Sequence, residues 1–188
     1  MEELLRIYKH ATLHDFAGIT WYEEAKQSCL AVAAGAGFDP GRVIGTVAVL
    51  SPRLRWEYNI EAARQLIKGR IYPGVLPSCA ERGYHVLWDE DWERWISGDK
   101  VQAFFHNISN PADPEPVTVD VWTARAWLGD WAWRKNISAQ LNKQIADDYR
   151  QAAARVGLLP CQFQAVIWVH IRRLCKGRAY RGQLSLDI

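Results

Sequence analysis

Several widespread functional signatures are missing from this sequence of 188 residues. It has no glycine-rich phosphate loop, no G-x-S-x-G motif and no HExxH motif, so nothing indicates a P-loop nucleotidase, an α/β-hydrolase or a zinc protease. No apolar run reaches the roughly 18 residues that a membrane span requires. The start, "MEELLRIYKH", has early acids and no signal-peptide core. We therefore expect a cytoplasmic protein with no membrane partner.

Cysteine and histidine indicate no metal site. The 4 cysteines are scattered and form no CxxC pair, which excludes zinc-ribbon and iron–sulfur spacings. We expect free thiols in a reducing compartment at Cys29, Cys79, Cys161 and Cys175. His10 and His14 lie one helical turn apart, but the sequence places no third ligand near them. We expect neither a metal nor another cofactor.

Charge is nearly balanced along the chain. A formal net charge of +2 does not by itself indicate a nucleic-acid partner. Basic residues are concentrated near the C-terminus, in a stretch that contains one acid, Asp187. They are Arg172, Arg173, Lys176, Arg178 and Arg181. Such a patch suits nucleic acid, and a solvated tail explains it equally well. The sequence leaves both interpretations open.

Hydrophobic periodicity is helical almost throughout, with no alternating strand pattern and no internal repeat. We predict an all-α protein with one domain over residues 1–188, in which the apolar segment "PGRVIGTVAVL" is buried. The next helix is predicted to begin near Pro52, and proline and glycine predict a loop from Arg70 to Gly83. The closing helix is predicted to begin at Pro160 and to bury Leu174. Three tryptophans are predicted to share one buried helical face: Trp88, Trp92 and Trp95.

Two ionisable residues stand at the heads of predicted helices. Lys100 follows Gly98 in "SGDKVQAFFHNI", and Asp120 in "VTVDVWTARAWLG" follows the helix-breaking "PADPEP". Helix starts expose backbone N–H groups that suit phosphate. A partly desolvated lysine can act as an amine nucleophile, and a carboxylate can stabilise positive charge on a sugar ring. The alternative is that Asp120 caps its own helix and Lys100 is a surface charge.

Four blocks between about Val43 and Cys175 extend this interpretation: "VAVLSPRLRWEYNIEAARQLI", "ISGDKVQAFFHNI", "VTVDVWTARAWLG" and "FQAVIWVHIRRLC". In order and spacing they resemble the helix-hairpin-helix DNA glycosylases, the superfamily of endonuclease III and 8-oxoguanine glycosylase. The second block is similar to the half-hairpin in which Gly-x-Lys starts a helix. The third is similar to the family segment "VDxHxxRxxxRxG", with Asp120 at the position of the catalytic aspartate. "RWISGDK" lacks the first glycine and the proline of the family hairpin, and Trp122 stands where histidine is common.

The resemblance implies a helical bundle with a DNA-facing cleft. It also implies a monomeric DNA glycosylase that flips a damaged or modified base out of duplex DNA. Lys100 would attack C1′ and give an associated AP-lyase activity, and Asp120 would stabilise the sugar or activate water. Arg53 fills the gap in the duplex or is a surface arginine, and Trp56 stacks on the base or belongs to the core. The candidate contacts to DNA or base are Arg53, Trp56, Asn59, Gly98, Trp122, Arg125, Arg172 and Arg173.

Three other classes of protein stay open. The phage-associated α-glutamyl/putrescinyl thymine pyrophosphorylases share the general pattern. A transferase of that kind attaches an amine to an activated thymine in DNA, releases pyrophosphate and leaves no abasic site. A non-catalytic DNA-binding module would bind without product, and a helical protein-interaction domain would show no salt-sensitive DNA affinity. The sequence identifies neither the base nor the biological setting, which is DNA repair or antiviral defence against modified DNA.

Overall fold

The computed structural model describes residues 1–179, with side chains as far as Leu174. Every regular element in this part of the chain is a helix, which confirms the all-α prediction. Part of the predicted basic patch lies outside the described residues, namely the side chains of Lys176 and Arg178 and the whole of Arg181. The side chain of Cys175 lies outside them as well.

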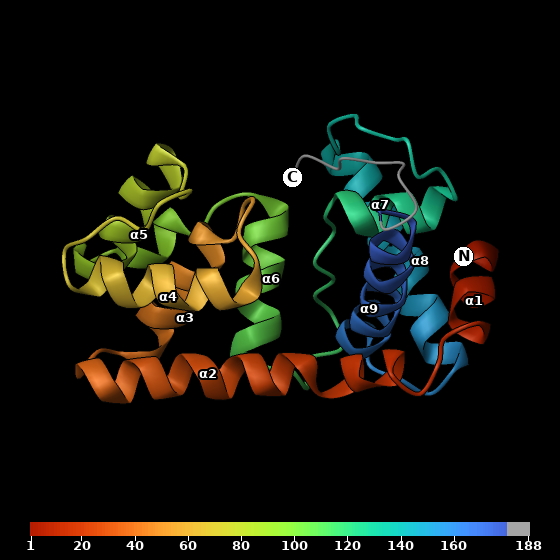
Figure 1. Ribbon diagram of the computed structural model, residues 1–188, viewed down its shortest axis with the longest axis horizontal. Helices are drawn as coiled ribbons and strands as arrows, with labels where there is room; N and C mark the ends of the chain where they lie inside the picture. The colour runs from red at the N-terminus through yellow and green to blue at the C-terminus, as the bar shows by residue number, and fades with distance from the viewer. Residues whose placement is uncertain (180–188) are drawn as a thin grey trace. The chain divides into compact units, whose positions relative to one another are not determined.

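The chain divides into two compact units, which are described separately (Figure 1). Unit 1 combines Met1–Tyr22 with the residues from Pro111 onward, and unit 2 comprises Glu23–Asn110. The boundary between them falls inside one continuous helix, α2 (Trp21–Ala36). Unit 1 is therefore assembled from two distant parts of the sequence, and no composition shift at Tyr22 marks this division.

Unit 1 is built around its C-terminal helix α9, which lies among the other helices of the unit (Figure 1). Phe163 and Ile167 of α9 are fully buried, and the Phe163 ring contacts the rings of Tyr8 and Tyr149 at centroid distances of 5.3 and 5.9 Å. Such aromatic pairs add packing energy beyond their buried area. The helices of this unit are α1 (Glu2–Lys9), the 3-10 helix η1 (Asp15–Thr20), α7 (Val121–Leu128), α8 (Ala139–Arg155) and α9 (Pro160–Ala179).

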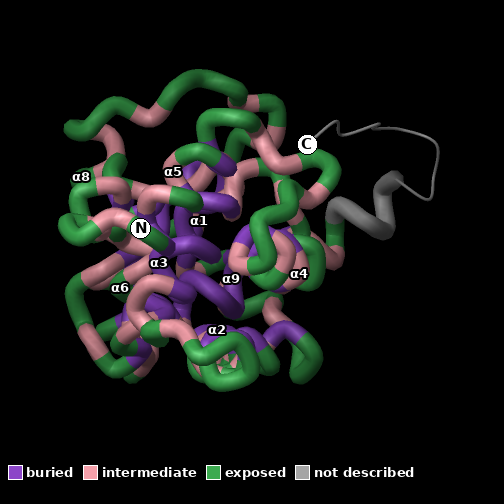
Figure 2. The backbone as a smooth tube through the Cα atoms, turned by 90° about the vertical axis from the view of Figure 1, so that its left-hand side faces the viewer, coloured by how far each residue is buried: buried purple, intermediate pink, exposed green. Residues whose placement is uncertain are grey.

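Unit 2 is built around the apolar helix α3 (Pro40–Leu50), as its composition predicts. Asp39 caps this helix by accepting a hydrogen bond from the Arg42 amide, and every residue from 43 to 50 is buried (Figure 2). The helices α4, α5 and α6 all contact α3. The remaining elements of the unit are α4 (Trp56–Ile67), α5 (Pro77–Trp88), the 3-10 helix η2 (Trp92–Trp95) and α6 (Asp99–Ser109).

Two helix boundaries differ from the prediction. α4 begins at Trp56 instead of Pro52, because Arg53 adopts a φ of 64°, which no residue of a right-handed helix can have. The loop predicted from Arg70 to Gly83 is also wrong in its second half, because α5 begins at Pro77. Proline suits the first turn of a helix, where its missing N–H is not needed.

Two predicted core residues are exposed. Trp88 ends α5 with 55% of its surface accessible, because Asp89 is extended and places Trp92 and Trp95 on a separate 3-10 helix. Leu174, predicted to be buried in the closing helix, is 43% exposed. It lies beyond the last buried residue of the described α9, Ile171.

Among the described helices, no single one is long and apolar enough to cross a membrane. By length and composition alone, α8 and α9 meet that requirement only when taken together, and they are bent by 97° at the break between them.

Gly18 allows η1 to approach α9 more closely than any other residue would. A Cβ atom added at Gly18 would lie 2.7 Å from the backbone carbonyl carbon of Ala165. We predict that Gly18→Ala lowers the free energy of unfolding by about 1–3 kcal/mol, because a helix backbone cannot yield as a side chain can. Urea unfolding measures this loss.

The control is Gly35→Ala, which adds a methyl group in α2 with no heavy atom within 4 Å. It should stabilise the protein by about 0.5–1 kcal/mol, since alanine favours helix over glycine. Equal effects of the two substitutions would contradict the close contact between η1 and α9.

Candidate functional site

Asp120 immediately precedes α7 and caps it. Its Oδ1 accepts hydrogen bonds from the amides of Trp122 and Thr123 at 2.9 and 2.8 Å, and from the Thr123 hydroxyl at 2.9 Å. Its Oδ2 accepts no hydrogen bond from any described residue, and the side chain is half-buried. One oxygen of this carboxylate therefore fixes the helix start, and the other is available to a ligand.

The segment before Asp120 is held by buried hydrogen bonds. Thr118 donates its amide to Gln164 Oε1 at 3.1 Å, and the Gln164 amide group donates to the Thr118 carbonyl in return. Tyr149 lies fully buried nearby and donates its hydroxyl to the Thr123 carbonyl at 3.4 Å. Burial raises the pKa of Tyr149 well above its usual value, and the negative charge of Asp120 raises it further. Asp120 is thus anchored to a rigid part of unit 1.

Lys100 lies in the first turn of α6, in unit 2. The predicted helix start is confirmed: Gly98 precedes the helix with a φ of 90°, in the region that favours glycine. The Lys100 ammonium donates to the Ser51 hydroxyl at 3.2 Å, and the residue is half-buried. Lys100 and Asp120 belong to different units, and their convergence in one cleft stays a prediction.

The other predicted base contacts of unit 2 lie in two settings. Arg53 is exposed in the turn before α4, and Trp56 is half-buried at the first position of that helix. Asn59 is only 2% exposed and donates its amide to the Val47 carbonyl at 3.0 Å. In this structure Asn59 therefore joins α4 to α3 inside the unit, and it does not lie at the surface where a base would approach.

Trp122 lies between two guanidinium groups in unit 1. The Arg125 Cζ lies 4.7 Å from the centre of the Trp122 ring, and the Arg172 Cζ lies 5.5 Å from it. Arg172 also lies 5.4 Å from the ring of Trp168, which in turn contacts Trp21. We call these five residues the Arg–Trp ladder. Stacking on an aromatic face orients a guanidinium while leaving its N–H edges available for phosphate.

The three arginines predicted to bind phosphate differ in their partners. Arg125 is buried and donates to the Trp133 carbonyl at 2.9 Å. Arg173 donates to both carboxylate oxygens of Asp15, at 2.9 and 2.8 Å. Arg172 donates no hydrogen bond to any described residue. Arg172 is therefore the arginine of the three whose donors are available to DNA.

Asp15 is fully buried and holds two side chains of α9. It bonds to Arg173, and its Oδ2 lies 2.9 Å from Nδ1 of His170. The Thr12 amide and hydroxyl also donate to Oδ2, at 2.8 and 3.0 Å. The hydrogen bonds from Arg173, with those from Thr12 and His170, hold the pKa of Asp15 well below its usual range. We call these residues the Asp15 network.

Cys29, Cys79 and Cys161 are buried and form no disulfide with one another. Burial raises the pKa of Cys29 to about 12. Among the described residues, no three histidine, cysteine, aspartate or glutamate side chains lie close enough together to hold a metal ion.

The model of the Family of unknown function (DUF7178) matches residues 1–174 of this chain. The chain belongs to this family. No curated protein and no solved structure matches it. Asp120, Lys100 and the Arg–Trp ladder all lie within the matched residues.

The sequence predicted three members of the ladder as separate contacts to DNA, from the blocks of the resemblance: Trp122, Arg125 and Arg172. Trp21 and Trp168 of the ladder were not predicted, since Trp21 lies far from the others in sequence. The Asp15 network was missed as well. The spacing of His170 and Arg173 by three residues places them on one face of α9, which is the signal that could have indicated a shared partner.

The low pKa of Asp15 predicts how stability depends on pH. Because the pKa is lowered in the folded state, the stabilisation is complete above the ordinary value of 3.8 and is lost as the pH falls below it. Asp15→Asn should lower the free energy of unfolding by about 2–3 kcal/mol at pH 7. The difference from the wild-type protein should shrink at pH 3, as urea unfolding at both values would measure.

Asp91→Asn is the control, because Asp91 is exposed and its side chain caps nothing. It should change stability by less than about 0.5 kcal/mol at either pH. A deficit of Asp15→Asn that stays constant between pH 7 and pH 3 would contradict an ionised Asp15.

Proposed function

We propose that this protein is a DNA glycosylase that flips a damaged or modified base out of duplex DNA and cleaves its glycosidic bond. The observation that carries the proposal is the start of α7. There Asp120 keeps Oδ2 unengaged, and the next residue but one, Trp122, belongs to the Arg–Trp ladder. The carboxylate for the sugar therefore stands at the start of the helix whose Trp122 ring stacks with Arg172 of α9, the proposed contact to the phosphate.

Charge and stacking support DNA as the partner. Arg172 is half-buried between Trp122 and Trp168 and has no carboxylate among the described residues. With no carboxylate beside it, this guanidinium can pair with a ligand that carries negative charge. A phosphate of the DNA backbone would supply it, and planar guanidinium donors match its oxygens.

Asp120 suits the sugar part of the reaction. Cleavage of the glycosidic bond leaves positive charge on C1′ and the ring oxygen, and an ionised carboxylate oxygen stabilises that charge. Oδ1 is occupied by three donors, so the orientation of Oδ2 is fixed before a substrate arrives. Such preorganisation is what makes an electrostatic group effective in a transition state.

Lys100 supplies the nucleophile in the bifunctional form of this proposal. Its neutral amine forms a bond to C1′ while the bond from C1′ to the base breaks, and the base leaves with the electron pair and takes up a proton. Opening of the sugar ring then gives a Schiff base, from which β-elimination cleaves the strand. In the monofunctional form, a water molecule attacks C1′ and gives up its proton to Asp120.

A non-catalytic DNA-binding module is the second candidate. It is favoured by the hydrogen bonds of the two proposed catalytic residues, since Asp120 caps α7 and Lys100 bonds to Ser51. Both bonds would be explained by structure alone. The two candidates differ in whether DNA is chemically changed.

Covalent trapping separates them. We predict that duplex DNA carrying a damaged, hydroxymethylated or glucosylated base forms a borohydride-stable adduct with the wild-type protein. Lys100→Ala should abolish the adduct, and Asp120→Asn should reduce the rate of base release by about 10²–10⁴-fold. Gel analysis of labelled DNA measures both. Asparagine can also cap a helix, so Asp120→Asn should fold normally.

Lys68→Ala is the matched control, because Lys68 is an exposed lysine of the same unit. It should leave the adduct unchanged. Abasic sites without an adduct would assign the reaction to Asp120 and water. Release of pyrophosphate without an abasic site would replace the glycosylase by a thymine-modifying transferase. Absence of any product with every base would overturn the proposal and leave the DNA-binding module.

The Arg–Trp ladder makes a separate prediction about binding. Arg172→Ala should weaken binding to duplex DNA at all sequences, and it should reduce the slope of log affinity against log salt concentration by about 1. Fluorescence anisotropy over a series of salt concentrations measures this slope. Arg64→Ala is the control, since Arg64 pairs with Glu61 at the surface of α4. Equal slopes for the two variants would contradict a phosphate contact at Arg172.

A further inference from the structure

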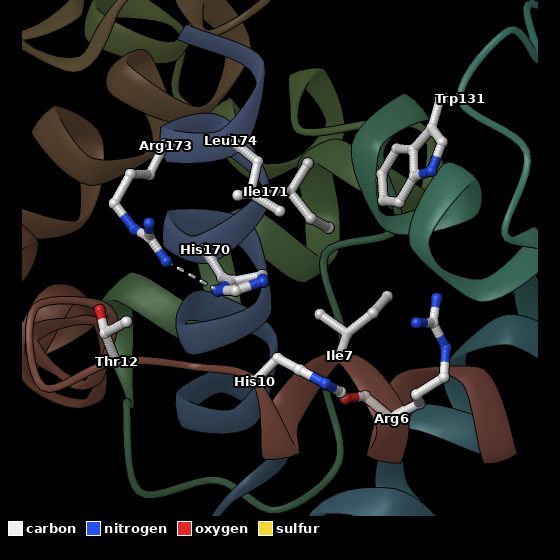
Figure 3. A pocket seen from close by; sticks show the side chains of 9 residues that line it. All are labelled: Arg6, Ile7, His10, Thr12, Trp131, His170, Ile171, Arg173 and Leu174. Carbon is white, nitrogen blue, oxygen red and sulfur yellow. Dashed lines mark hydrogen bonds between the residues drawn. The ribbon is translucent and has the colours of Figure 1, made fainter. Parts of the chain in front are cut away.

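Unit 1 contains a pocket of about 520 Å³ that the glycosylase proposal does not use. It lies between α1 and α9, beside the loop that follows α7 (Figure 3). One part of its wall is apolar and consists of Ile7, Trp131, Ile171 and Leu174. A volume of this size is within the range of pockets that hold small organic ligands.

His170 presents one ring nitrogen to this pocket. Its Nδ1 lies 2.9 Å from the Asp15 carboxylate and 3.2 Å from Nη2 of Arg173, so this nitrogen is occupied within the Asp15 network. Nε2 is the ring nitrogen that remains for a ligand. Figure 3 shows this second nitrogen directed away from Arg173. Nε2 has no partner among the described residues, although His170 is only 6% exposed.

Arg6 supplies a cation at the opposite side. Its Nε and Nη2 donate to the two oxygens of Glu3, and Nη1 makes no hydrogen bond with a described residue. Figure 3 shows the guanidinium directed from α1 toward the side where Trp131 lies. The pocket thus offers a ring nitrogen at His170, a donor at Arg6 and an indole beside apolar side chains.

The loop that carries Trp131 is fixed at both sides of this residue. Asp130 accepts a hydrogen bond from the Ala132 amide at 2.9 Å, which closes a turn around Trp131. The buried guanidinium of Arg125 donates to the Trp133 carbonyl. These bonds fix the backbone on both sides of Trp131, while the indole packs against the core cluster of unit 1 and also lines the pocket.

We propose that this pocket binds a nucleoside monophosphate. A base has a planar face for Trp131, and its polar edge carries groups that can form a hydrogen bond with Nε2 of His170. The phosphate carries the negative charge that Nη1 of Arg6 can bind. The inference does not depend on the chemistry at Asp120.

Calorimetric titration of the full chain with the ribo- and deoxyribonucleoside 5′-monophosphates tests this inference. At least one of them should bind, and Arg6→Ala and Trp131→Ala should each raise its Kd about tenfold. Arg6 is exposed, and the half-buried Trp131 packs against the core cluster of unit 1 without being one of its buried residues, so both variants should fold. The expected affinity of Asp120→Asn equals that of the wild-type protein, which separates this test from that of the glycosylase.

Two controls match the two substitutions. Arg64→Ala removes an arginine paired with a glutamate three residues away, as Arg6 is, and Trp88→Ala removes an exposed tryptophan. Neither should change the Kd. Absence of binding at millimolar nucleotide would overturn the inference. So would binding that Arg6→Ala and Trp131→Ala leave unchanged, or inorganic phosphate binding as tightly as the nucleotide.

Discussion

Asp15 is buried in η1, and its partners His170 and Arg173 lie 155 and 158 residues further along the chain. A buried carboxylate without such partners would cost several kcal/mol, so the two ends of the sequence must meet for unit 1 to fold. The same carboxylate bonds to Nδ1 of His170 and to the guanidinium of Arg173, and so fixes the orientation of both side chains. His170 and Arg173 both line the pocket, so this arrangement also fixes part of the pocket wall.

Asp120 shows how one carboxylate can serve structure and chemistry together. Capping requires only one oxygen, and three donors hold that oxygen in place. The capping position at a helix start therefore fixes the orientation of a carboxylate and leaves its second oxygen unoccupied. The sequence raises the question whether Asp120 is a helix cap or a catalytic acid. In this geometry the two roles are compatible, because each would use a different oxygen.

Helical periodicity was sufficient to predict the fold class and the burial of α3, and helix-breaking residues were sufficient to predict the helix starts at Gly98 and Asp120. These features depend on neighbouring residues, whose preferences are local. The exposure of Trp88 depends instead on Asp89 being extended, and the early start of α5 depends on Pro77 acting as a first-turn residue. Local patterns allow either outcome at such positions.

The remaining features depend on contacts between distant segments, which a single sequence does not reveal. Asp15 has no local signal of burial, and Trp21 joins the Arg–Trp ladder only through the packing of α9. The division into two units inside α2 is likewise unmarked by proline, glycine or a change in composition. Whether Lys100 and Asp120 meet belongs to the same class of long-range questions.

Helix α9 assigns different tasks to adjacent residues: His170 faces the pocket, Arg172 stacks in the ladder, and Arg173 bonds to Asp15. An α-helix turns by about 100° per residue, so these tasks are separated only by rotation about a shared axis. Inserting or deleting one residue upstream of His170 would turn all three side chains away from their partners at once. The number of residues in α9 before His170 is therefore constrained independently of their identity. Substitutions along this helix should be tolerated more readily than insertions or deletions.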